Sequence, residues 1–315
     1  MKKILRWIIL IPVAGLALCL GVVLARPAIA RIQGLHDPKS LEQFTPFSIG
    51  ETKTLDILPL YENAAQGDLA GGHGVSYLIR TDGATILFDL GNNMTAASPS
   101  PLEQNMTSLG ISLDQVDVIV ISHRHPDHVG GQNWWMAGTF SLDGKTQAPL
   151  GNIPVYVPEE MSYPGVKPVL AVTPTLLAEG VATTGLMPYY QLFPVWLQTP
   201  IGYEESLAVD VSGEGIVLIT GCGHMGLKAL LERAQKVFDA PIVGVVGGLH
   251  YGDASAADLQ DEIGLLQAIQ PHVIALSPHD SGEAALQAFT QAFPGAYTSI
   301  VVGQPIRLPA AVAAP

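Results

Sequence analysis

Several histidines of this chain stand directly after apolar runs that predict strands. Six histidines share this position: His123, His125, His128, His224, His250 and His279. The runs that precede them are DVIVI, IVLIT, IVGVV and VIAL. Because ligand groups in α/β sheets gather just outside the carboxyl ends of strands, we expect these imidazoles to meet at one rim of a sheet. This requirement restricts the fold to one that brings four separate strand ends together.

The periodicity of apolar residues predicts a mixed α/β protein. Strands are expected over 75–79, 85–90, 117–121, 216–220, 242–246 and 273–276, and helices over 101–109, 226–238, 256–269 and 282–293. Two short apolar runs, 299–302 and 306–308, could close the sheet. Residues 131–200 are rich in Pro, Gly and aromatic residues and give no clear assignment. Antiparallel strands followed by alternating strands and helices are typical of an α/β architecture.

The first thirty residues predict a membrane-directed segment. An uncharged apolar run from Trp7 to Ala25 follows a basic start, and at about 1.5 Å per residue it nearly spans a hydrocarbon layer about 30 Å thick. A transmembrane anchor explains this length better than a signal peptide, although Ala28–Ala30 offers a cleavage site. With the basic residues in the cytoplasm, either alternative exports the rest of the chain to the periplasmic or extracellular side. The expected organisation is an anchor or signal peptide over 1–30, a linker over 31–50, one domain over 51–308 and a tail over 309–315.

The charge of the chain excludes one class of partner. Fifteen Lys and Arg residues against 28 Asp and Glu residues give a formal net charge of −13. Such a surface repels phosphate backbones, so we expect no nucleic-acid binding. The two cysteines, Cys19 and Cys222, are too few for a disulfide framework. We expect a small-molecule substrate, and contact with a membrane through the N-terminal helix alone.

The segment His123–His128, with sequence HRHPDH, has the spacing of a metal-binding loop. After a strand, His123 and His125 could hold one divalent ion, while Asp127 and His128 turn toward a second ion. Imidazole and carboxylate ligands suit zinc, and manganese or iron could occupy the same set. We therefore expect a divalent metal cofactor, with two zinc ions as the preferred occupants.

Two segments resemble the metallo-β-lactamase superfamily: ISHRHPDHVGG at 121–131 resembles its signature loop, and TILFDLG at 85–91 resembles its early strand-Asp-x-Gly element. Four other motifs resemble the subgroup named after dihydropterin–ribofuranosylaminobenzene phosphate synthases: GHGVS (72–76), TTG (183–185), TGCGHMG (220–226) and GGLH (247–250). The resemblance covers roughly residues 50–308. It implies an αββα four-layer sandwich with a dinuclear metal site at one rim.

The resemblance also implies roles for individual residues. His123 and His125 would hold the first metal, Asp127 and His128 the second, and His279 stands where the superfamily has its last metal-binding histidine. The usual histidine after the signature loop and the usual bridging aspartate are both missing, and His224 is the candidate for the missing ligand of the first metal. Cys222 stands at the position of the bridging aspartate, either as a thiolate ligand or as a small buried apolar residue.

Further side chains have a functional and a structural interpretation. Asp127 is expected to orient a water and accept its proton, and His250 to act as a catalytic or substrate-facing imidazole rather than as a ligand. Asp89 is expected to support the metal loop, and His73 either lines the rim or belongs to a turn. Five aromatic residues could form a cleft wall or pack in the core: Trp134, Trp135, Tyr189, Tyr190 and Trp196.

Three functions remain open from the sequence. The first is an exported metal-dependent hydrolase that uses an activated water on a small ester-like substrate, with a phosphoester preferred over a lactam. The second is a transferase or synthase like the namesake of the subgroup, which the expected export disfavours. The third is a non-catalytic metal-binding sensor or scaffold, suggested by the missing bridging aspartate.

Overall fold

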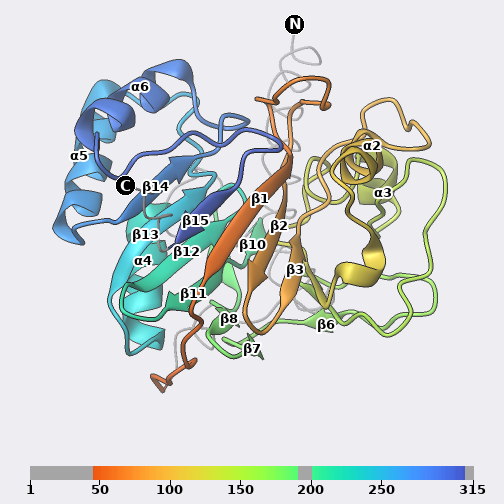
Figure 1. Ribbon diagram of the computed structural model, residues 1–315, viewed down its shortest axis with the longest axis horizontal. Coiled ribbons are helices and arrows are strands. Elements are labelled where there is room, and N and C mark those ends of the chain that lie inside the picture. Colours follow the sequence, from red (N-terminus) through yellow and green to blue (C-terminus); the bar gives the residue numbers. More distant parts are fainter. Residues whose placement is uncertain (1–44, 191–200, 309–315) are drawn as a thin grey trace, which may run out of the picture.

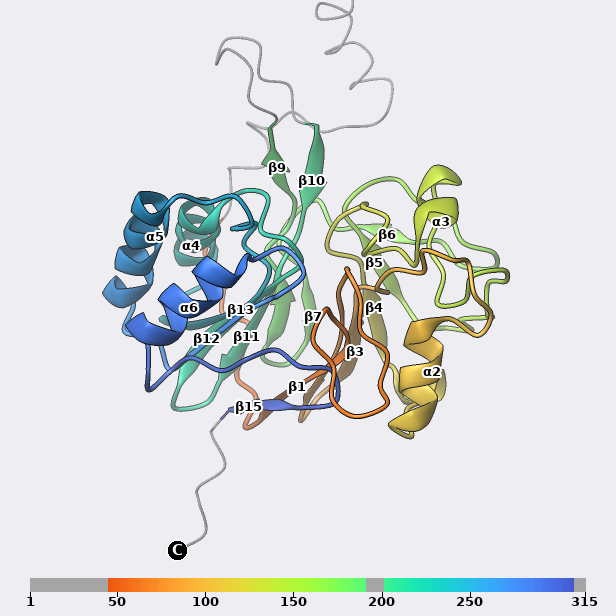
Figure 2. The same ribbon diagram turned by 90° about the horizontal axis from the view of Figure 1, so that it is seen from above.

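The computed structural model describes residues 45–190 and 201–308. These residues form two β-sheets that pack face to face, with helices on both outer sides (Figure 2). The order of layers is therefore helix, sheet, sheet, helix, which agrees with the predicted four-layer arrangement. The last strand of the chain returns to the sheet that contains the first strand and pairs with it (Figure 1).

The first sheet contains seven strands, mostly from the N-terminal half. They are β1 (Leu55–Tyr61), β2 (Ser76–Thr81), β3 (Thr85–Phe88), β4 (Val118–Val120), β5 (Val155–Val157), β6 (Val169–Leu170) and β15 (Ile306–Leu308), in the order β15-β1-β2-β3-β4-β5-β6. The strands from β15 to β3 are antiparallel, and those from β3 to β6 are parallel. The predicted hairpin between 75–79 and 85–90 is present as β2 and β3.

The second sheet contains six strands. They are β7 (Leu176–Ala178), β8 (Val181–Thr183), β11 (Leu207–Val211), β12 (Gly215–Thr220), β13 (Ile242–Gly247) and β14 (Val273–Leu276), in the order β14-β13-β12-β11-β8-β7. The strands β12, β13 and β14 are parallel, so their carboxyl ends meet at one edge. A separate antiparallel ribbon, β9 (Met187–Tyr189) and β10 (Gly202–Glu204), rises from this edge (Figure 2).

Helices cover the outer face of each sheet. The helices are α2 (Pro101–Ser108) and α3 (Gln132–Met136) on the first sheet, and α4 (Leu227–Val237), α5 (Ala256–Ala268) and α6 (Glu283–Ala292) on the second. A capping box between Ser100 and Glu103 starts α2, and one between Ser255 and Asp258 starts α5. The apolar stripe of α4 predicted from the sequence is buried, including Leu230 and Ala234.

Three apolar clusters hold the layers together. One lies between α4–α6 and the second sheet, one between the two sheets, and one between the first sheet and α2. Strands β12 and β13 are buried along their whole length because side chains of both faces are covered. The continuous apolar runs that ended in histidines are thus buried strands, and the sandwich fixes where their ends lie.

The domain begins before the boundary predicted at residue 51. Within the expected linker, the Phe47 amide donates to the Val237 carbonyl over 3.0 Å, and Ile49 is buried against the second sheet. The short run 299–302 forms only isolated bridges rather than a strand. Within residues 45–190 and 201–308, no helix is long and apolar enough to cross a membrane. The predicted anchor or signal peptide over 1–30 and the tail over 309–315 lie outside the described residues.

Candidate metal centre

Four strand ends meet at one rim of the sandwich. The loop after β4 carries His123, His125, Asp127 and His128, and it faces the loops after β12, β13 and β14 of the second sheet. The metal-ligating side chains there fall into overlapping groups whose donor atoms lie within 4.8 Å of one another. The six metal ligands predicted from the sequence form two of these groups: His123, His125 and His224 in the first, and Asp127, His128 and His279 in the second.

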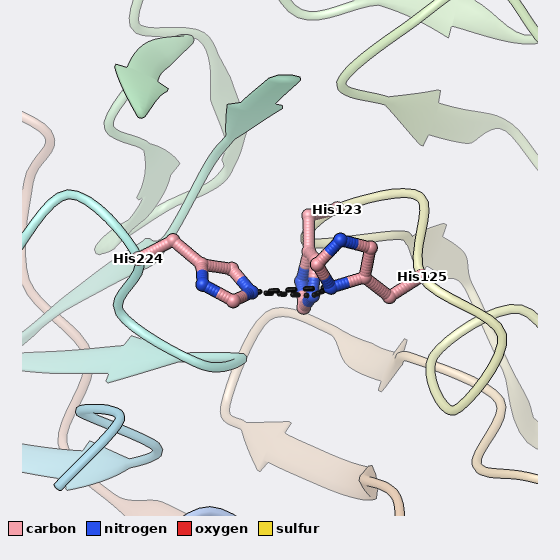
Figure 3. Close-up of side chains that lie close together, drawn as sticks. All are labelled: His123, His125 and His224. Atoms are coloured by element: carbon pink, nitrogen blue, oxygen red, sulfur yellow. Dashed lines mark hydrogen bonds between the residues drawn. The ribbon is translucent and has the colours of Figure 1, made fainter. Parts of the chain in front are cut away.

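In the first group, one ring nitrogen from each of the three histidines points toward a common centre (Figure 3). His123 Nε2 lies 3.0 Å from His125 Nδ1, and His224 Nε2 lies 3.3 Å and 3.2 Å from those two atoms. Tetrahedral zinc with nitrogens at about 2.0–2.1 Å separates its ligands by about 3.3 Å. The three imidazoles therefore already have the spacing of a zinc triad.

Hydrogen bonds alone do not explain this contact. A neutral imidazole carries only one N–H. A single proton can bridge two of the three ring nitrogens, and the lone pair of the third nitrogen then faces the other two without a hydrogen bond. Burial also lowers the pKa of all three rings: that of His123 lies well below its usual value, that of His125 at about 4 and that of His224 at about 3. The rings are thus neutral donors at physiological pH, and a divalent cation fits them better than protons do.

The second group surrounds a buried thiol. Cys222 Sγ lies 3.1 Å from His128 Nε2 and 3.1 Å from His279 Nε2, and burial raises the pKa of the thiol well above its usual value. Asp127 Oδ2 lies 3.8 Å from His128 Nε2. Cys222 also forms a possible ligand group with His123 and His128. The thiol therefore stands between the two groups, at the place the sequence predicted for a bridging ligand.

A buried carboxylate orients two of the rings. Asp89 accepts hydrogen bonds from the Ser122 amide at 2.7 Å, the Ser122 hydroxyl at 2.6 Å and His128 Nδ1–H at 2.7 Å. Because the Ser122 hydroxyl donates to Asp89, its oxygen accepts from His123 Nδ1–H at 3.0 Å. Both rings therefore turn Nε2 toward the centre, which is the support predicted for Asp89. Only glycine fits at position 221, where a Cβ would lie 2.1 Å from the Ser122 hydroxyl oxygen.

A second buried carboxylate acts on His279 in the same way. The Ser277 hydroxyl donates to Glu62 at 2.7 Å, and its oxygen therefore accepts from His279 Nδ1–H. Glu62 and Ser277 are both fully buried. His125 has the opposite orientation: its Nδ1 faces the centre, and its Nε2 lies 3.5 Å from the Tyr189 hydroxyl. Four rings are thus held in the orientation that a metal requires.

Glu204 fixes the loop that carries Cys222 and His224. Its buried carboxylate accepts hydrogen bonds from the amides of Cys222, Gly223 and His224 at 3.0, 2.8 and 2.9 Å. The Thr220 hydroxyl adds a fourth bond at 3.1 Å. This side chain gives the loop after β12 its shape.

Replacement of Glu204 by glutamine is expected to lower the free energy of unfolding by about 2–3 kcal/mol, because the new amide group turns N–H groups toward N–H donors in a buried site. Urea unfolding of the full chain measures this loss. Glu205→Gln is the matched control, since among the described residues the buried Glu205 carboxyl has no hydrogen-bond partner and burial raises its pKa well above the usual range. Equal losses of unfolding free energy in the two variants would contradict the role assigned to Glu204 in holding the loop after β12.

The stability of the metal-free protein is expected to fall as pH rises from about 6.5 to 9. Burial alone would lower the pKa of His128, but the carboxylates of Asp89 and Asp127 raise it to about 9. In that window the folded chain keeps a proton that the unfolded chain has released, so the stabilisation present below pH 6.5 is lost, on the order of 2 kcal/mol. Thermal melts in a chelator measure the change, and a melting temperature that rises with pH would contradict it.

Two further histidines border the centre. His250 is exposed, its ring centroid lies 4.6 Å from that of His224, and its backbone has a φ of 58°. Its amide donates to Asp280 at 2.9 Å, which helps to hold this strained backbone. His73 Nε2 lies 3.1 Å from Asp127 Oδ2, and the His73 side chain is 57% exposed. Both predicted rim residues therefore face the centre from its open side.

Some residues of the site carried no signal in the sequence. Glu62, Glu204 and the role of Tyr189 depend on contacts between distant segments. Of the two alternatives given for Trp135, the structure shows core packing against the first sheet, and the Trp134 indole N–H donates to the Asp143 carbonyl. Trp196 lies outside the described residues. His272 is on the surface as predicted, paired with Glu214 at 2.7 Å.

Comparisons with known proteins give a family match and a relative. Residues 69–140 match the model of the Metallo-beta-lactamase superfamily. The 7,8-dihydropterin-6-methyl-4-(beta-D-ribofuranosyl)-aminobenzene-5'-phosphate synthase of Methanocaldococcus jannaschii is 24% identical over 297 residues, which cover 82% of this chain and 99% of that protein. These matches confirm the resemblance to the superfamily and to the subgroup with this name.

Two solved structures share the fold. Tm1679, described as a metal-dependent hydrolase of the beta-lactamase superfamily, is 20% identical with a TM-score of 0.59, over 80% of this chain and 98% of the other. The metallo-beta-lactamase fold protein YhfI from Bacillus subtilis is 12% identical with a TM-score of 0.51, over 81% of this chain and 99% of the other. The strand ends that carry the candidate ligands thus belong to a shared architecture.

Proposed function

We propose that this chain, whose residues 69–140 match the model of the Metallo-beta-lactamase superfamily, is a metal-dependent hydrolase of small ester-like substrates, with phosphoesters preferred. One observation carries the proposal: three ring nitrogens from two sheets lie 3.0–3.3 Å apart beside a second group of ligands. The nitrogen and sulfur donors favour zinc, with manganese or iron as alternatives. We propose two ions, one for each group, with Cys222 between them.

The protein residues have separate tasks in this proposal. Divalent ions at the two groups would supply a water of lowered pKa and would polarise the substrate. Asp127 would orient the attacking water and accept its proton, with His73 fixing one of its carboxylate oxygens. His250, exposed beside His224, would donate a proton to the leaving group or bind the developing negative charge.

Metal analysis combined with a substrate panel tests this function. The full chain in detergent is loaded with zinc or manganese and assayed with 4-nitrophenyl phosphate, bis(4-nitrophenyl) phosphate, 4-nitrophenyl acetate and nitrocefin. We expect two equivalents of metal, turnover of the phosphoesters above the lactam, and loss of turnover in chelator. Metal bound without turnover of any substrate would instead support a metal-binding sensor or scaffold.

A synthase is the second candidate function. Its support is the relative from Methanocaldococcus jannaschii, nearly all of whose length is matched. Asp280 departs from the His-Cys-Thr-Gly motif of the subgroup, here His279-Asp280-Ser281-Gly282, and the proposed export separates the chain from cytoplasmic precursors. A pterin-dependent condensation by the zinc-loaded chain, giving the linked dihydropterin and ribofuranosyl-aminobenzene phosphate that the relative's name describes, would favour the synthase over the hydrolase.

We also propose that the domain is exported and stays anchored by residues 1–30, with signal-peptide cleavage as the alternative. The support is the apolar run after a basic start. Alkaline phosphatase fused after residue 315 tests it in a Gram-negative host. Activity in the membrane fraction would support the anchor, activity in the soluble periplasmic fraction would support cleavage, and an inactive fusion would contradict export.

A further inference from the structure

A groove of about 520 Å³ opens beside the first ligand group. One wall is the strand β9 with the residues beside it, Met187–Tyr190, and the other is the loop and helix that follow His224. His224 itself belongs to the lining, so the groove begins at the candidate metal centre. A substrate whose reacting bond lies at the metals therefore has space there for one of its arms.

The inner end of the groove is flat and apolar. The Tyr189 ring stacks on the His224 ring, with centroids 4.7 Å apart and an angle of 28° between the planes. Met187 and Met225 add thioether side chains to the lining. Gly202, paired with Tyr189 across the β9–β10 ribbon, leaves room for this ring, because a Cβ there would lie 2.2 Å from the Tyr189 hydroxyl oxygen. This surface suits an aromatic or planar apolar group.

The helical wall changes character along its length. Ala229, Arg233 and Lys236 are spaced by three or four residues and line one face of α4, and Met225 lies just before the helix. Lys236 lies about 10 Å beyond Ala229 along the helix axis. Arg233 is buried and donates to the carbonyls of Thr184 and Leu186 at 3.3 and 3.4 Å, which ties the helix to the segment before β9. The exposed Lys236 is therefore the cation at the outer end of the groove.

The charge of the groove opposes that of the whole chain. Its lining contains two cations, Arg233 and Lys236, and one carboxylate, Glu232, which lies 3.9 Å from Lys228 on the same helix. The chain as a whole carries a formal charge of −13. A positive groove in an acidic protein attracts anions locally and aligns them with the reacting centre.

We propose that this groove binds a substrate arm that is flat and apolar near the metals and ends in an anionic group, such as a carboxylate or phosphate, at Lys236. The inference names the substrate class of the proposed hydrolase, and it rests on that function only for the position of the reacting bond. Binding of a non-reacting arm can therefore be measured separately from turnover.

Isothermal titration calorimetry of the zinc-loaded full chain tests the groove with two probes, biphenyl-4-carboxylate and biphenyl-4-methanol. We expect the carboxylate to bind about tenfold more tightly than the alcohol. Lys236→Gln should weaken the carboxylate about threefold to fivefold, the effect of one exposed ion pair, and leave the alcohol unchanged. Lys145→Gln, which changes an exposed lysine on the side of the first sheet, is the control and should change neither.

Ala229→Glu places a negative charge inside the groove and should weaken the carboxylate at least tenfold while the bound zinc content stays unchanged. Ala229→Trp should exclude both probes, and circular dichroism checks that each variant folds. Equal affinity for acid and alcohol would overturn the anionic end. Carboxylate binding that survives both Ala229 variants but is lost in His125→Ala would place the probe on the metal and overturn the groove. Binding as expected without turnover of any ester would contradict the proposed hydrolase and not the groove.

Discussion

Replacement of His125 by alanine is expected to remove one equivalent of metal and to lower kcat/KM by at least about 1,000-fold. His125 supplies one of only three ring nitrogens in the first group, and its Nδ1 lies 3.0 and 3.2 Å from the other two. Two imidazoles hold zinc far more weakly than three, and the loss of an ion that activates water removes several kcal/mol of transition-state stabilisation. Metal analysis by mass spectrometry and phosphodiester turnover measure the two effects.

The second group makes this prediction sharper. Asp127, His128 and His279 do not depend on His125, so the variant should keep about one equivalent of metal. His272→Ala is the control, because this exposed histidine pairs with Glu214 away from the rim. If the variant retains two equivalents of metal and full turnover, His125 is not a ligand of the centre. Loss of both ions would show that the two groups bind metal only together.

Replacement of Asp89 by asparagine is expected to lower the free energy of unfolding by about 2–4 kcal/mol. The fully buried carboxylate accepts three hydrogen bonds at 2.6–2.7 Å, and an amide group there turns N–H toward one of the donors. Asparagine tolerates the backbone φ of 59° at this position, so the change leaves the backbone conformation in place. Metal affinity of the second group should fall about 10–100-fold.

A separate signature identifies the role of the charge. Without the Asp89 carboxylate, burial is offset only by Asp127 and Glu204, and the pKa of His128 should fall from about 9. Nuclear magnetic resonance titration of the metal-free protein follows this ring. Asp117→Asn is the matched control, because Asp117 accepts one exposed hydrogen bond from the Thr85 amide, and it should cost less than 1 kcal/mol. A small loss of stability in Asp89→Asn would contradict the support assigned to Asp89.

The long buried elements were predictable from the sequence. The strands β12, β13 and β14 are continuous apolar runs because both of their faces are covered, and α4 carries a clear apolar stripe. Parallel strands bring their carboxyl ends to one edge, so histidines placed after such runs had to lie near one another. The rule placed His224 and His279 without any knowledge of their partners.

The region 131–200 was not predictable because its elements are very short. Strands β5 to β9 contain two or three residues each, which is too few for a period to be recognised. Tyr189 reaches the centre only because β9 pairs with β10 and stacks the ring on His224. Glu204 likewise binds backbone amides 18 to 20 residues further along the chain, and no side-chain pattern records such a contact.

Neither ligand group belongs to one sheet alone. The loop after β4 supplies His123 and His125 to the first group and Asp127 and His128 to the second, and the other sheet completes each group with His224 or His279. An ion bound there would link two sheets that are otherwise joined by apolar contact and by a few hydrogen bonds, such as that from Ser277 to Glu62. The ion would then bind late in folding, after the two sheets have packed together. Its release would destabilise the whole sandwich rather than one loop.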